Sequence, residues 1–73
     1  MYSIKRECYT ENTFNGHTDN PYWLIRFDAY VIGLKDNGTF WSIINGVNIK
    51  QPHIVEKLNK IIKECNLSIT LVL

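Results

Sequence analysis

The sequence lacks features that mark several classes of protein. Only two cysteines occur among 73 residues, whereas a secreted domain of this size that relies on disulfides usually carries more. No apolar run approaches the roughly 20 residues that a membrane-spanning helix requires, and the opening MYSIKRECYT contains no apolar segment of a signal peptide. We therefore expect a cytoplasmic protein with reduced thiols.

An excess of charge of one sign is also missing. Lys and Arg number 8 against 7 Asp and Glu, which gives a net charge of +1. The overall charge therefore does not predict a nucleic acid or an anionic membrane as partner. An apolar content of 45% is too high for a disordered chain, and this length provides for one core. We expect a single compact domain over residues 1–73.

Patterns typical of catalysis and metal binding are absent as well. Cys8, His17, His53 and Cys65 could supply zinc ligands, but no C-x-x-C or H-x-x-x-H pair anchors such a site. No serine lies in a nucleophile elbow, and so short a chain leaves little room for a substrate cleft. We predict no catalytic residue, no metal, no cofactor and no enzymatic activity.

The clearest pattern that is present lies in residues 52–65, where apolar residues recur with the period of a helix. They are Ile54, Val55, Leu58, Ile61, Ile62 and Cys65. Pro52 suits the first helical position, and Asn66 suits the left-handed residue that closes a helix. Residues 67–73 then alternate as LSITLVL, which predicts a final strand.

Three further segments, 2–10, 22–34 and 39–44, alternate in the manner of strands. Between the first two, residues 11–21 are polar and aperiodic, which predicts a long loop. Asp36-Asn37-Gly38 is the strongest hairpin signal. We therefore predict a small α+β fold in the order β-β-β-α-β, with a mainly antiparallel sheet and one amphipathic helix packed on one face.

The predicted sheet face away from the helix is the candidate binding surface. The phase of 22–34 places Tyr22, Arg26 and Tyr30 on this face, and the following hairpin adds Trp41. Tyr, Trp and Arg dominate hot spots of protein interfaces. The same rings could instead pair across strands, be buried in a homodimer, or stack on unpaired bases. The predicted partner-binding residues are these four together with Phe14 and His17 of the 11–21 loop.

The leading functional hypothesis is a small non-enzymatic protein-binding modulator or inhibitor that acts through these aromatic residues. Ile (10), Asn (8) and Lys (6) are abundant, a bias of AT-rich genes that favours a phage, prophage or other mobile element. The alternative is a nucleic-acid-binding accessory protein that uses the same sheet aromatics. A third hypothesis is a structural subunit that forms a homodimer through 67–73 or through the outer sheet face.

Overall fold

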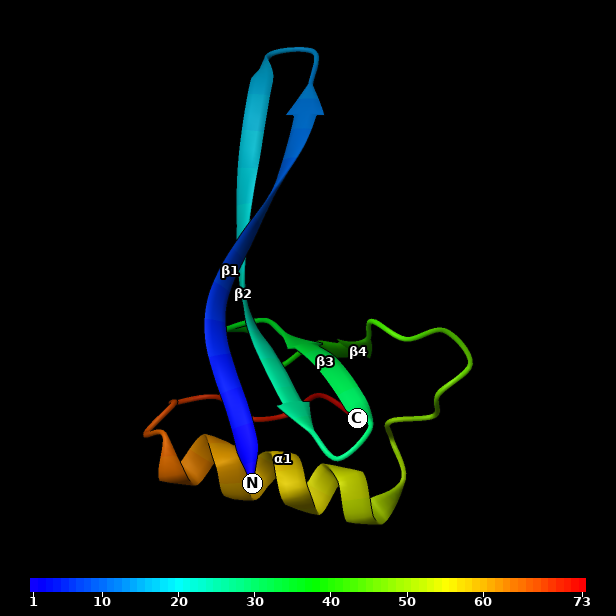
Figure 1. Cartoon of the computed structure of the whole chain (residues 1–73). Helices are drawn as coiled ribbons and strands as arrows, with labels where there is room; N and C mark the ends of the chain where they lie inside the picture. Colours follow the sequence, from blue (N-terminus) through cyan, green and yellow to red (C-terminus); the bar gives the residue numbers. More distant parts are fainter.

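A four-stranded antiparallel sheet lies over one helix in the computed structural model, which describes all of residues 1–73 (Figure 1). The elements are β1 (Tyr2–Thr13), β2 (Gly16–Phe27), β3 (Tyr30–Leu34), β4 (Phe40–Ser42) and α1 (Pro52–Glu64). The strands follow one another in the sheet in chain order, so consecutive strands form hairpins. The predicted α+β class is confirmed, whereas the predicted element order is only partly right. The helix α1, with 13 residues, is too short and too polar to span a bilayer.

The predicted strand 22–34 is in fact two strands joined by a tight turn. Phe27 pairs with Tyr30 across a connection made of Asp28 and Ala29, and Asp28 adopts a left-handed φ of 51°. Asp tolerates this conformation better than most residues because its short side chain can hydrogen-bond locally. No Asn-Gly or Asp-Gly pair marks the turn, and the alternation of apolar residues continues through it, so the sequence pattern did not reveal it.

The predicted loop 11–21 is wrong, because most of it belongs to a long hairpin. β1 and β2 remain paired from Tyr2–Phe27 out to Thr13–Gly16, around a turn at Phe14 and Asn15. Beyond Cys8 and Pro21 no third strand accompanies them, and the resulting two-stranded ribbon projects from the body of the molecule (Figure 1). Neither face of this ribbon is covered, so it lacks the apolar alternation that would have predicted strands.

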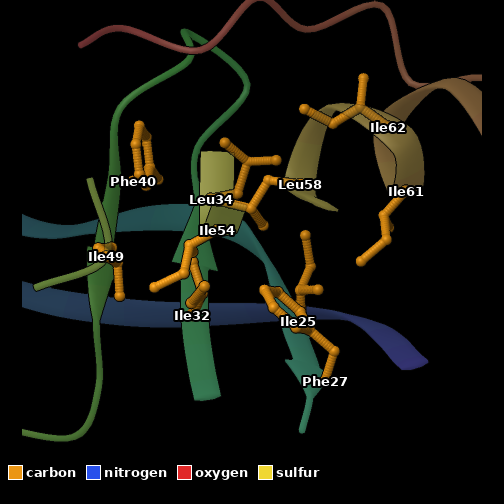
Figure 2. Close-up of a cluster of buried hydrophobic side chains, with 10 residues drawn as sticks. All are labelled: Ile25, Phe27, Ile32, Leu34, Phe40, Ile49, Ile54, Leu58, Ile61 and Ile62. Carbon is orange, nitrogen blue, oxygen red and sulfur yellow. The ribbon is translucent and has the colours of Figure 1, made fainter. Parts of the chain in front are cut away.

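The core lies between α1 and the inner face of the sheet, where side chains from β2, β3 and β4 point toward the helix (Figure 2). Ile25, Ile32 and Leu34 from the strands and Ile54, Leu58 and Ile61 from the helix are fully buried. Burial of each such side chain is worth roughly 1.5–3 kcal/mol before conformational entropy is subtracted. The predicted helix stripe is confirmed, with Val55 and Cys65 packed at its margins.

Both ends of α1 follow the sequence prediction. Pro52 occupies the first turn after an extended Gln51, and Asn66 closes the helix with a φ of 55°. The Asn66 N–H donates to the carbonyl of Lys63 at 3.2 Å, and the Leu67 N–H donates to that of Ile62 at 3.0 Å. This pair of bonds is a Schellman motif, which reverses the chain direction and brings Leu67 onto the core.

Residues 67–73 run back beside α1 as an extended segment and do not form the predicted strand (Figure 1). Leu67, Ile69 and Leu71 pack against the core, as their alternation suggested. The segment covers the core on the helix side of the sheet instead of extending a sheet edge. A single main-chain bond joins it to the β3–β4 loop, from the Val72 N–H to the Gly38 carbonyl at 2.9 Å.

The β3–β4 loop confirms the predicted hairpin signal. The Lys35 N–H donates to the Thr39 carbonyl at 2.8 Å, and the Gly38 N–H donates to the Lys35 carbonyl at 3.0 Å. Gly38 has a φ of 93°, and a Cβ there would collide with the carbonyl of Thr70. Glycine is therefore required twice over, by the turn and by the close approach of the C-terminal segment.

A polar cluster on the helix side ties β1 to this loop. The guanidinium of Arg6 donates two hydrogen bonds to the carboxylate of Asp36, at 3.0 and 2.7 Å, and lies 4.7 Å from the ring centroid of Trp23. The hydrogen bonds from Arg6, and to a smaller extent its charge and a bond from Trp23, hold the pKa of Asp36 below its usual value. The cluster thus joins β1, β2 and the loop after β3.

Tyr2, the first residue of β1, contacts the C-terminal end of α1. Its hydroxyl donates to Oε2 of Glu64 at 3.0 Å and lies 3.6 Å from Sγ of Cys65. The hydrogen bond with Cys65, followed by that with Glu64, raises the pKa of the Tyr2 hydroxyl because both favour its protonated form.

The left-handed Asn66 yields the first prediction. Asn66→Ala should lower the free energy of unfolding by about 1 kcal/mol, because Ala adopts a positive φ less readily than Asn, and Asn66→Gly should raise it slightly. Urea unfolding followed by circular dichroism measures both changes. Ser68→Ala, at an exposed position two residues on, is the control and should be neutral. Equal stability of Asn66→Ala and the parent chain would contradict the prediction.

The Arg6–Asp36 pair predicts a pH-dependent contribution to stability. The pKa of Asp36 is lower in the folded chain than in the unfolded chain. The stabilisation by the ionised pair is therefore complete above the unfolded-state pKa near 4 and is lost as the pH falls through the folded-state pKa. Asp36→Asn should therefore lower the thermal midpoint at pH 7 and have a much smaller effect at pH 2. An equal difference between the two proteins at both pH values would show that the ionised pair contributes nothing.

Candidate functional site

An aromatic groove lies on the sheet face opposite α1. Tyr9 of β1, Tyr22 of β2 and Trp41 of β4 line it together with Lys35 and Thr39 from either side of the β3–β4 loop. The depression has a volume of about 470 Å³ and is open to solvent. These five residues are called the aromatic groove below.

The three rings form a row across the sheet. The ring centroids of Tyr9 and Tyr22 are 6.0 Å apart at an interplanar angle of 51°, and those of Tyr22 and Trp41 are 5.4 Å apart at 54°. These separations lie in the range of favourable aromatic pairs. The ammonium of Lys35 lies 5.9 Å from the centroid of the Tyr9 ring, within reach of a cation–π interaction.

Strand register explains why the rings meet. Glu7 pairs with Tyr22, so Tyr9 lies diagonally across from Tyr22 on the same face. Gly33 of β3 pairs with Trp41, and the indole ring covers this glycine so closely that a Cβ there would collide with it. Because β3 presents no side chain at Gly33, the indole can lie across β3 and reach Tyr22 on the strand beyond.

Of the predicted partner-binding residues, the structure brings only Tyr22 and Trp41 together. Arg26 is exposed on the same outer face but lies at the far end of β2, beside Ser3 and Lys5 and away from the groove. Tyr22 and Trp41 thus lie on the predicted face and in contact.

The prediction that Tyr30 lies on the outer face is wrong, because Tyr30 lies on the helix side of the sheet. Its ring is partly buried, packs against the core and lies 5.5 Å from that of Phe27. In an antiparallel hairpin, directly paired residues share a face. The turn at Asp28 and Ala29 pairs Tyr30 with Phe27, and so places it on the face opposite to that of Tyr22.

Phe14 and His17 lie at the end of the ribbon, distant along both strands from the aromatic groove. Phe14 is in the turn, and its side chain is fully exposed, with a relative accessibility of 103%. His17 pairs with Asn12 and is also exposed. They form a separate surface and add nothing to the groove.

Tyr9 is a member of the groove that was not among the predicted partner-binding residues. The Asn15-Gly16 pair is a partial signal for it, because a tight hairpin centred there would pair Tyr9 directly with Tyr22. The actual turn is one residue earlier, at Phe14 and Asn15, and it leaves the two rings on the same face in diagonal positions. Lys35 and Thr39 flank the predicted hairpin and share the phase of Trp41, so their position could be expected from the turn alone.

The cysteines and histidines do not converge. Cys8 is exposed at the base of the ribbon, and Cys65 contacts Tyr2 at the other end of β1. His53 is in the first turn of α1, and both thiols are free. No three His, Cys, Asp or Glu side chains lie close enough together to hold a metal ion.

Comparison with known proteins gives no match, since no protein-family model, no curated protein and no solved structure is significantly similar to this chain.

The packing of Trp41 on Gly33 yields a prediction about the shape of the groove. Gly33→Ala should displace the indole and open the row of rings at Tyr22, and should lower stability by about 1–3 kcal/mol because of overpacking. Nuclear magnetic resonance of the two indole N–H groups measures the change. The Trp41 signal should shift much more than the Trp23 signal, since Trp23 lies on the opposite face. An unchanged Trp41 signal would contradict the prediction.

Proposed function

We propose that this chain is a small non-enzymatic protein-binding modulator or inhibitor that acts in the cytoplasm, and that its partner contacts the aromatic groove. The observation that carries the proposal is the row of Tyr9, Tyr22 and Trp41 on a sheet face that no helix covers. Rings of this kind bury a large apolar area at a low cost in side-chain entropy. A mobile genetic element as the source remains part of the proposal, on the basis of residue usage alone.

Partial exposure of the three rings also supports a contact surface. Tyr9, Tyr22 and Trp41 are half-buried, whereas the core side chains on the opposite face are fully buried. The groove is therefore already formed in the free chain, because its rings pack on one another and Trp41 is seated on Gly33. A preformed surface avoids part of the ordering cost of association.

The distribution of charge favours a protein partner over nucleic acid. Lys35 is the sole charged residue that lines the groove. The adjoining ribbon, residues 9–20, contains Glu11 and Asp19 and no Lys or Arg. Nucleic-acid affinity comes largely from phosphate neutralisation by several cations, which this surface does not offer.

The tip of the ribbon is a second contact in the proposal. Phe14 is exposed on all sides at the end of a projecting hairpin, and an aromatic side chain in this position can enter a pocket of a partner as an anchor. A partner seated in the groove would lie beside the ribbon, because Tyr9 and Tyr22 are at its base.

Affinity capture with defined variants tests the proposal. Tagged chain should retain one stoichiometric protein from host-cell lysate after nuclease treatment. Trp41→Ala and Tyr22→Ala should each weaken that binding at least about thirty-fold, as expected of hot-spot residues. Phe14→Ala tests the ribbon in the same assay.

Lys60→Ala, on the exposed face of α1, is the matched control and should bind as the parent chain does. Circular dichroism establishes that each variant is folded before it is used. A partner that disappears with nuclease would favour the nucleic-acid alternative, and full binding by folded Trp41→Ala would exclude the groove as the contact surface.

A further inference from the structure

The rings of the aromatic groove form ridges, not a flat platform. Interplanar angles of 51° and 54° leave wedge-shaped gaps on either side of Tyr22. A flat ligand such as a base stacks best on a single exposed ring face, whereas a puckered saturated ring can fill a gap between two tilted rings. The shape therefore favours a ligand with compact, non-planar apolar groups at regular spacing.

The groove offers hydrogen-bond donors without matching carboxylates. Tyr9, Tyr22 and Thr39 carry hydroxyls, Trp41 an indole N–H and Lys35 an ammonium group, and none of these side-chain donors makes a hydrogen bond within the chain. No Asp or Glu lines the groove. A ligand rich in exposed acceptors and poor in donors fits this lining.

An extended proline-rich segment has both properties. A polyproline II helix makes no internal hydrogen bonds, so its carbonyls are free to accept, and proline has no N–H to satisfy. It advances about 3.1 Å per residue, and with centroid steps of 6.0 and 5.4 Å the midpoints of the two gaps lie at most about 6 Å apart. Prolines two positions apart advance about 6 Å along the helix, so they would fall on the two gaps beside Tyr22.

We propose that the aromatic groove binds a proline-rich segment of a partner protein in the polyproline II conformation, with one acidic residue of that segment against Lys35. The inference rests on the proposed function, since it names the chemistry of the partner at the same surface. The acidic residue follows from charge complementarity, because Lys35 is the only charge in the groove and no acid side chain there neutralises it. Main-chain strand pairing is not the mode, because the groove lies on a sheet face and not along an edge.

Titration with synthetic peptides tests the inference on the full chain. The probe is a decapeptide of prolines with one central glutamate, and the control peptide has glycine and serine in place of the prolines. Resonance of the indole N–H groups reports binding, with Trp23, on the opposite face, as internal reference for the intact fold. The proline peptide should shift the Trp41 signal in a saturable manner, and the control peptide should bind at least about ten-fold more weakly because it is not preorganised.

Charge reversal tests the role of Lys35. Lys35→Glu should lower the affinity for the glutamate peptide several-fold, and a peptide with lysine in place of the glutamate should bind this variant with restored affinity. Equal shifts with the proline and control peptides, or no shift of Trp41, would overturn the inference. Binding of a thymidine oligonucleotide at physiological salt without binding of the proline peptide would overturn it in favour of single-stranded nucleic acid.

The protein-binding function and the proline-rich ligand can be rejected independently of each other. If affinity capture gives a nuclease-resistant protein that requires Trp41, and the proline peptide does not bind, the protein-binding function stands and only the proline ligand is rejected. If neither the captured partner nor the peptide depends on Trp41, the groove itself is rejected as a binding surface.

Discussion

Burial of one sheet face beneath α1 is the contact from which the other features of this structure follow. Ile54, Leu58 and Ile61 cover Ile25 and Ile32, and these five side chains are fully buried. A sheet with one face committed to a helix leaves the other face to water. The aromatic groove lies on that second face. The packing of α1 on the first face therefore also fixes the strands that carry the rings of the groove. The Schellman motif at Asn66 then brings the C-terminal segment back over the same core.

The features predicted correctly are those that depend on residues near one another in sequence. The helix, its Pro52 start and its Asn66 end, and the hairpin at Asn37-Gly38 are local patterns with local causes. The errors arose where an alternating pattern has more than one structural meaning. Residues 67–73 alternate because one side packs on the core, which an extended segment without a strand partner also satisfies. The turn at Asp28 lies within an uninterrupted alternation, so only pairing across the sheet reveals it.

The candidate site shows how a single turn changes a predicted surface. Tyr22 and Trp41 were predicted together because the Asn37-Gly38 hairpin determines the register of β4, and the outer face of β2 was in the correct phase. Tyr30 was misplaced because two turn residues reverse the face on which it lies. Tyr9 was missed because its register depends on the far end of the ribbon. Periodicity within a segment thus indicates which side chains share a face only as far as the next turn, whereas a site built across strands requires every turn between them.

The ribbon beyond Cys8 and Pro21 has a consequence for how this fold can diversify. It pairs only with itself, and its residues are almost all exposed, so no core residue depends on its length. Addition or removal of two residues in each strand would keep every remaining side chain on its present face, because the side-chain period of a strand is two. The reach of Phe14 from the groove is therefore adjustable in steps of about 7 Å, whereas a change of a single residue pair would turn the tip to the opposite side. Selection could thus alter the distance between the two contact surfaces in discrete increments while the rest of the fold stays the same.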